Sequence, residues 1–154
     1  MLDDPEILQT AAQAIAFIAL EVPRGDIRNV MAPGLAELRT TLAAQGVAPT
    51  GPWFTHHFRM DPAVFDFAIC VPVSTAVSAA GRVQAGELAA ATVARTVYHG
   101  DFGGLAAAWG EMDAWVAAAG HKPRADLWEC YLAGPEVSAD PADWRTQLNR
   151  PLLA

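Results

Sequence analysis

The feature that most constrains the fold is an internal repeat of 74 residues. Glycine, proline and Gly-Asp signals recur at this spacing, and the hydrophobic runs between them follow the same order twice: strand, Gly-Asp turn, helix, glycine, proline, strand, strand. We therefore predict an α+β fold of two pseudo-symmetric βαββ halves, about residues 1–73 and 87–154, that form one antiparallel sheet with two helices. The matching signals are Gly46 and Gly120, Pro49 and Pro123, and, at a spacing of 75, Gly25-Asp26 and Gly100-Asp101.

Two stretches carry apolar residues at steps of three and four, which is the period of one helical face. This spacing predicts helices over Ile27–Gln45 and Phe102–Ala119. Pro33 lies inside the first stretch, where it either kinks the helix or marks the first turn of its main part. The glycine that follows each stretch is expected to end its helix.

The remaining apolar runs are rich in β-branched and aromatic residues, which favours strands. The first run is alanine-rich and also compatible with a helix, and Pro151 is expected to restrict the last run to a sheet edge. Small and polar residues over Ser74–Gly86 predict the connection between the halves. The expected strands are Glu6–Leu20, Trp53–Arg59 and Phe65–Val73 (a hairpin turning at Asp61-Pro62), Leu88–Tyr98, Leu127–Leu132 and Thr146–Leu152.

Composition and charge exclude several classes of protein. The chain has 154 residues, of which 53% are hydrophobic and 18% charged, so it forms a packed domain and not a disordered chain. Its net charge of −7 lacks the basic footprint of a nucleic-acid binder. The apolar run Ala11–Leu20 is too short to span a membrane, and the N-terminus has no basic leader, so we expect a cytoplasmic protein.

Glu129 lies in the middle of the apolar run Leu127–Leu132. In a strand, side chains alternate between faces, so Glu129 and Tyr131 share one face. A buried carboxylate either finds a partner or has a raised pKa. We infer that Glu129 receives a cation or polar ligand from outside; the alternatives are a solvated strand edge or an arginine partner from elsewhere in the chain.

The repeat aligns Thr55 with Glu129 and His57 with Tyr131. Two duplicated halves leave a groove where they meet, and such clefts hold small molecules. We expect these four side chains to face one shared groove, with Trp53, which shares a face with Thr55. His56 and His57 point to opposite strand faces, so no metal site is expected, and no motif indicates a cofactor.

The order of these segments resembles the GyrI-like small-molecule binding domain, which serves as the effector-binding domain of AraC-type and MerR-type regulators and also occurs as a free protein. The resemblance covers nearly the whole chain. The segments that carry it are Gly51–Phe54, Phe65–Phe67, Val71–Val73, Tyr98–Leu105, Ala108-Trp109, Trp128–Leu132 and Asp140–Thr146.

The resemblance implies a SOUL-like fold whose groove binds drug-like molecules, often cationic or aromatic, with Glu129 facing the ligand. It adds Phe102 and Trp109 to the expected ligand contacts, although a tryptophan on a helical stripe is also explained by core packing. The partner implied is a small molecule, with neither nucleic acid nor membrane, and any protein partner stays unidentified.

Some stand-alone members of the family hydrolyse cyclopropane-bearing DNA-alkylating natural products with acids and aromatic hydroxyls of the groove. The alternative function is therefore a hydrolase that uses Glu129 and Tyr131. Two departures favour binding over hydrolysis: Ala68 replaces a second acid, and Phe102 replaces a tyrosine.

Overall fold

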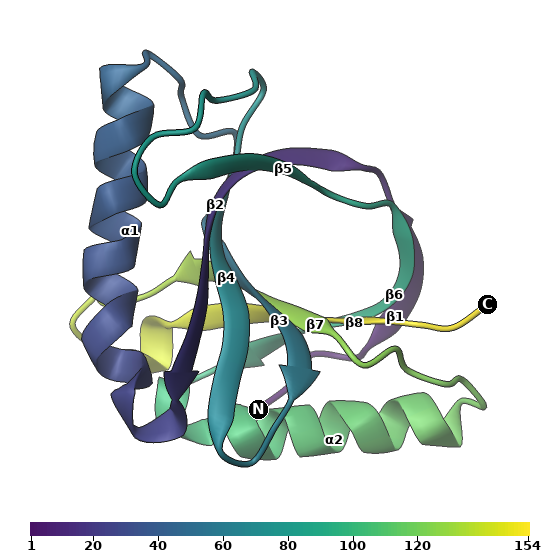
Figure 1. Ribbon diagram of the computed structural model, residues 1–154. Coiled ribbons are helices and arrows are strands. Elements are labelled where there is room, and N and C mark those ends of the chain that lie inside the picture. Colours follow the sequence, from purple (N-terminus) through teal and green to yellow (C-terminus); the bar gives the residue numbers. More distant parts are fainter. The chain divides into compact units, whose positions relative to one another are not determined.

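The computed structural model describes all residues from Met1 to Ala154 and divides into two compact units (Figure 1). Unit 1 comprises Met1–Thr10 and Ala91–Ala154, and unit 2 comprises Ala11–Ala90. Each unit combines antiparallel strands with one long helix, so the predicted α+β class is confirmed.

Unit 2 places α1 against one face of a four-stranded antiparallel sheet with the order β3-β4-β2-β5. Leu38 and Leu42 on α1 pack with Ile18, Phe67 and Ile69 in its core, and all five are almost fully buried. The elements are β2 (Gln13–Pro23), a short 3-10 helix η1 (Arg24–Asp26), α1 (Ile27–Ala44), β3 (Phe54–Met60), β4 (Val64–Pro72) and β5 (Gln84–Leu88).

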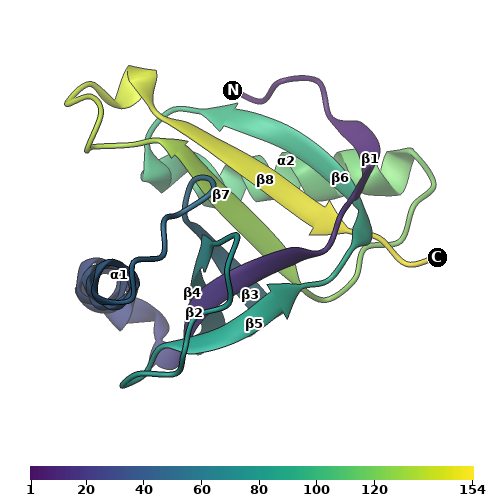
Figure 2. The same cartoon turned by 90° about the horizontal axis from the view of Figure 1, so that it is seen from above.

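Unit 1 repeats this plan with the strand order β1-β6-β8-β7, and Figure 2 shows β8 running between β6 and β7. Met112 and Val116 on α2 pack against Ala94 of β6 and Leu152. The elements are β1 (Glu6–Thr10), β6 (Ala91–His99), η2 (Phe102–Gly104), α2 (Leu105–Ala118), β7 (Leu127–Ala133), η3 (Pro141–Asp143) and β8 (Arg145–Pro151).

The two units correspond element by element, as the repeat predicts. β2-α1-β3-β4 in unit 2 matches β6-α2-β7-β8 in unit 1. Each unit also has a fourth strand that the repeat did not indicate, because β5 pairs with β2 and β1 pairs with β6. These pairings accompany the grouping of Met1–Thr10 with Ala91–Ala154 in unit 1 and of β5 with the rest of Ala11–Ala90 in unit 2.

Both long helices end in the way that their glycines predict. Gly46 and Gly120 have φ values of 67° and 81°, a left-handed conformation that favours glycine. After α1, the Val47 amide donates to the Leu42 carbonyl at 2.9 Å, and after α2 the His121 amide donates to Val116 at 3.1 Å. Pro33 lies within α1, which continues through it.

Three strand expectations are corrected. The run Glu6–Leu20 forms two strands, because the chain leaves β1 after Thr10 and enters β2 at Gln13. Ser74–Gly86 is not only a connection, since its last residues begin β5. The prediction that Pro151 makes its strand an edge is wrong: β8 pairs on both sides, and Pro151 is tolerated because it is the last residue of the strand.

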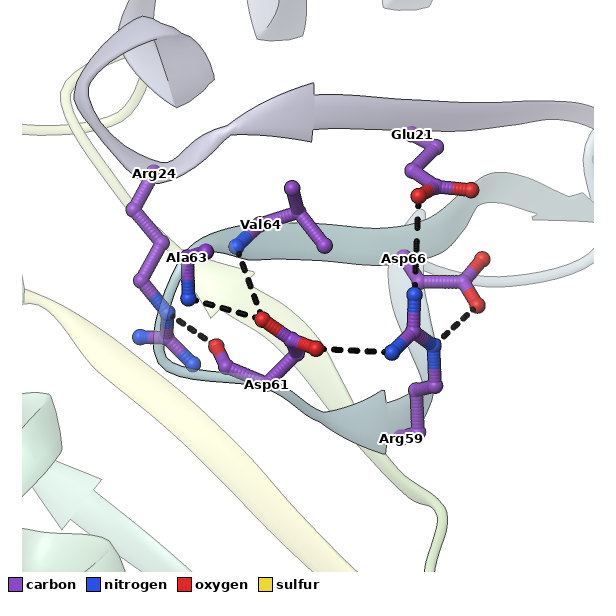
Figure 3. Close-up of polar contacts among 7 residues, drawn as sticks. All are labelled: Glu21, Arg24, Arg59, Asp61, Ala63, Val64 and Asp66. Carbon is purple, nitrogen blue, oxygen red and sulfur yellow. Dashed lines mark hydrogen bonds and ion pairs between the residues drawn. The ribbon is translucent and has the colours of Figure 1, made fainter.

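The β3–β4 turn is held by a polar cluster that Figure 3 shows in close-up. The Asp61 carboxylate accepts hydrogen bonds from the backbone amides of Ala63 at 2.7 Å and Val64 at 3.2 Å. The Arg59 guanidinium forms ion pairs with three carboxylates, those of Glu21, Asp61 and Asp66. The predicted hairpin at Asp61-Pro62 is therefore confirmed, and a single guanidinium pairs with all three acids.

Candidate functional site

The Glu129 carboxylate accepts hydrogen bonds from two neutral donors of unit 1. The indole Nε1–H of Trp109 donates to Oε1 at 2.7 Å, and the hydroxyl of Tyr131 donates to Oε2 at 2.9 Å. Tyr131 reaches Glu129 because the two residues are alternate positions of β7, as the sequence predicts, whereas Trp109 comes from α2. Both carboxylate oxygens are thus oriented by aromatic side chains.

No arginine, lysine or histidine forms an ion pair with Glu129, so the alternative of an arginine partner is not observed. Burial raises the pKa of Glu129, and the hydrogen bonds from Trp109 and Tyr131 oppose that rise only in part. The residue nevertheless keeps a partly accessible surface. A cation that reaches this carboxylate would stabilise its negative charge strongly, because water screens the attraction only weakly in such surroundings.

Three aromatic side chains, those of Tyr131, Phe102 and Trp144, form a cluster that begins at this carboxylate. The rings of Phe102 and Tyr131 pack edge to face, with their centroids 6.0 Å apart. The centroid of the Phe102 ring lies 5.0 Å from that of Trp144. Phe102 remains 40% exposed. Trp144 is fixed by a hydrogen bond from its Nε1–H to the Ser138 carbonyl at 2.9 Å. Trp144 was not among the contacts predicted from the sequence, because a loop residue has no periodicity that assigns it to a face.

Trp109 donates a hydrogen bond to Glu129 and also packs against the core, so the core-packing interpretation is confirmed and its contact with a ligand stays a prediction. Its ring packs beside the buried clusters under α2. The Arg150 guanidinium lies 5.2 Å from the ring centroid. Arg150 is itself held by Asp113 of α2, with Nε–H and Nη2–H each donating to a carboxylate oxygen at 3.1 Å. This bidentate pair therefore supports the indole that binds Glu129.

The other predicted contacts form a separate set in unit 2. His57 Nε2 lies 3.1 Å from Thr55 Oγ1, and its ring stacks on Phe67 with centroids 5.3 Å apart. Burial, together with the neighbouring His56 and Arg24, lowers the pKa of His57 to about 4, so it is neutral at pH 7. Trp53 packs against the core beneath α1. A groove shared by the two sets stays a prediction.

Thr146 lies beside the Glu129 site and was not singled out from the sequence. On β8 it pairs with Tyr98 of β6 and with Tyr131 of β7, so its side chain is on the Glu129 face of the sheet. The residue is fully buried, and its hydroxyl oxygen has no hydrogen-bond partner. An unpaired buried hydroxyl destabilises the folded state.

Replacing Thr146 by valine should therefore raise the free energy of unfolding by about 1 kcal/mol, measured by urea denaturation. Thr96 supplies a matched control, because it is also buried but its hydroxyl donates to the Asp3 carbonyl at 2.7 Å. T96V should lower the stability by a similar amount. A loss of stability in T146V that equals the loss in T96V would show that the Thr146 hydroxyl is paired in solution.

A family model of the GyrI-like small molecule binding domain matches residues 3–152. The chain belongs to this family. The resemblance derived from the sequence is thereby confirmed, and binding of a small molecule is the general property that membership carries. A search of curated proteins finds no sequence match to this GyrI-like domain.

Solved structures share the fold of this GyrI-like domain at low sequence identity. The C-terminal domain of EcmrR has a TM-score of 0.85 at 18% identity, and the match covers 97% of both chains. A hydrolase from Listeria innocua has a TM-score of 0.69 at 13% identity, covering 97% of this chain and 91% of the other. SAV2435 bound to tetraphenylphosphonium has a TM-score of 0.64 at 11% identity, covering 99% and 95%.

The match to EcmrR in its complex with DNA has the same TM-score, 0.85 at 18% identity. It covers 97% of this chain but only 57% of the EcmrR chain. The GyrI-like domain thus spans little more than half of the EcmrR chain. No helix in the structure has both the length and the apolar character needed to cross a membrane.

Proposed function

We propose that this GyrI-like domain binds a lipophilic cation with aromatic groups at Glu129, and that it sequesters or senses that molecule in the cytoplasm. The observation that carries the proposal is a carboxylate with two neutral hydrogen-bond donors, Trp109 and Tyr131, and no cationic partner. A permanent cation placed there would supply the counter-charge that the protein does not provide.

The neighbouring rings favour an aromatic or otherwise lipophilic cation over a small hydrated one. The faces of tyrosine, phenylalanine and tryptophan attract cations, and they do so more strongly where water is excluded. Phe102 and Trp144 extend this surface away from the carboxylate. Because Glu129 already has two donors, the ligand needs no hydrogen-bond donor, and its charge can be delocalised. Trp53, Thr55 and His57 stay predicted contacts.

The structural neighbours are consistent with this class of ligand. SAV2435 was solved with tetraphenylphosphonium, a lipophilic aromatic cation. EcmrR, whose C-terminal domain has this fold, was solved in complex with DNA. We therefore propose a role in drug sensing or protection, in which this chain contacts the small molecule and makes no direct contact with nucleic acid.

The Glu129→Gln variant tests the proposal with tetraphenylphosphonium as the probe. The amide keeps an acceptor for Trp109 and removes the charge, so we expect the affinity to fall at least about tenfold, which corresponds to about 1.4 kcal/mol. The melting temperature should stay equal or rise slightly, because burial already disfavours the charged carboxylate. Quenching of tryptophan fluorescence measures binding, and scanning calorimetry measures stability.

Two controls make this test specific. Triphenylphosphine oxide is a neutral aromatic probe, and its affinity should be nearly the same for wild type and E129Q. Glu136 is an exposed acid of the loop after β7, so E136Q removes one charge without touching the site. Equal binding of the cation by wild type and E129Q would refute the proposal, and so would equal losses in E129Q and E136Q.

A hydrolase of strained cyclopropane-bearing electrophiles is the second candidate, because Glu129 and Tyr131 form a hydrogen-bonded acid and hydroxyl. Burial raises the pKa of the Glu129 carboxyl group, and this is the direction that favours a general acid. The lack of a second acid at Ala68 and of a hydroxyl at Phe102 weakens this candidate. A turnover assay separates the two functions: stoichiometric protection of the electrophile supports binding, and consumption of many equivalents that E129Q abolishes supports hydrolysis.

A further inference from the structure

The opposite face of the unit 1 sheet carries a polar network that the proposed function does not use. Arg95 of β6 is paired with Asn149 of β8, and Val97 is paired with Gln147. Glu129 is paired with Leu148, so the alternation of β8 puts Asn149 and Gln147 on the other face from Glu129. The network is therefore separate from the candidate ligand site.

The hydrogen bonds of this network have a fixed direction. Arg95 Nε–H donates to Asn149 Oδ1 at 2.6 Å, and Asn149 Nδ2–H donates to the Trp128 carbonyl at 3.5 Å and to Gln147 Oε1 at 3.2 Å. A guanidinium can only donate and a backbone carbonyl can only accept. The orientation of the Asn149 amide is thus set at both ends, and the Gln147 oxygen is committed to Asn149.

The polar groups of this network that are not used within it are hydrogen-bond donors. Gln147 keeps its amide N–H groups, and Arg95 keeps the Nη1–Nη2 edge of its guanidinium; both side chains are partly accessible, while Asn149 is fully buried. Burial raises the pKa of the adjacent Cys130 thiol to about 11, so this group adds no negative charge. By contrast, the four arginines that pair with carboxylates in this chain are Arg59, Arg82, Arg124 and Arg150.

Glu6 is the acid that comes nearest to Arg95 in the strand register. It stands opposite Arg95 in the β1–β6 pairing, but its side chain is exposed and no ion pair joins the two. The Arg95 guanidinium can therefore pair with an anion from outside the chain, and Glu6 would compete with that anion. Removing the Glu6 carboxylate should therefore strengthen the binding of an anion, whereas removing a donor of the site should weaken it.

We propose that Arg95, Asn149 and Gln147 form a binding site for an organic carboxylate. The two oxygens of a carboxylate match the Nη1–Nη2 edge of Arg95, which gives a bidentate charge-assisted contact. Gln147 adds an N–H donor to one of these oxygens, and Asn149 holds both residues in place from beneath. A neutral amide of the same shape offers one acceptor oxygen and no charge, so it binds more weakly.

Equilibrium dialysis with 2-naphthoate, and with 2-naphthamide as its neutral counterpart, tests this site on the whole chain. Wild type should bind the carboxylate at least about tenfold more tightly than the amide. Gln147→Glu keeps the acceptor for Asn149 and turns the outward donor into an acceptor, so it should lower naphthoate affinity at least about tenfold. Glu6→Gln should raise the affinity about threefold, because it removes the competing acid.

Arg95→Met should also abolish the preference for the carboxylate over the amide. If that variant does not fold, Q147E and E6Q still test the site. The proposal is overturned if wild type binds naphthoate and naphthamide equally. It is also overturned if Q147E binds naphthoate as well as wild type does, or if E6Q leaves the affinity unchanged. Glu129→Gln should not alter naphthoate binding, which separates this site from the proposed cation site.

Discussion

Replacing Asp113 by alanine should lower the free energy of unfolding by about 3 kcal/mol, because it leaves a buried charge without its counter-ion. Arg150 is only 6% exposed, and its guanidinium donates twice to Asp113. The carbonyls of Arg124 and Asp126 also accept from Arg150, at 3.4 and 3.3 Å, but they carry no charge to balance it. The pair joins α2 to β8, so its loss loosens the helix that positions Trp109.

A double-mutant cycle with urea denaturation tests this prediction. The D113A/R150M double variant should recover most of the lost stability, since methionine replaces the buried charge by an apolar chain. Glu111 is an exposed acid on the same helix, and E111A should change the stability by less than about 0.5 kcal/mol. A D113A variant that unfolds like E111A would show that the Arg150 charge is solvated.

Lowering the pH from 7 to 4 should cost the folded protein about 3 kcal/mol through His57 alone. Its pKa is lowered from 6.5 to about 4, so the unfolded chain takes up a proton more readily than the folded one. Stability is therefore lost as the pH falls below 6.5, and the loss levels off below about 4. The cause is burial: the charged imidazole would lose its hydration where it packs between Phe65 and Phe67, and the nearby His56 and Arg24 also disfavour its charge.

The measurement is the free energy of unfolding as a function of pH in wild type and in His57→Gln. The variant lacks the titrating ring, so the difference between the two curves should shrink by about 3 kcal/mol between pH 7 and pH 4. Glu129 acts in the opposite direction, because a raised carboxyl pKa favours the folded state as the pH falls. A difference that does not vary with pH would place His57 in contact with water.

Part of the candidate site follows from local rules. Alternation along one strand places Glu129 and Tyr131 on a common face, and their hydrogen bond confirms it. The repeat aligns Thr55 with Glu129 and His57 with Tyr131, and in unit 2 these two side chains also contact each other, with a threonine hydroxyl at the position of the acid and an imidazole at that of the tyrosine. These contacts join residues two positions apart, so the geometry of a strand is sufficient to predict them.

The contacts that join distant segments could not be predicted in this way. The sequence gives no signal that Trp109 would donate to Glu129, since this requires the packing of α2 on β7. Thr146 becomes an unpaired hydroxyl only when β8 lies between two strands, and Pro151 suggested the opposite placement. The sequence likewise indicates only that Arg150 lies on a strand, because its ion pair with Asp113 depends on the packing of α2 against β8.

The pairing of β1 with β6 has a consequence for the order in which the chain folds during synthesis. Thr10 and Ala91 are hydrogen-bonded although they are 81 positions apart. All of unit 2 is made between them, so its sheet can close while Glu6–Thr10 has no strand to pair with. The nascent chain therefore carries an open strand edge until β6 emerges, and Glu6, Asp3 and Asp4 place negative charge there, which discourages pairing with other chains.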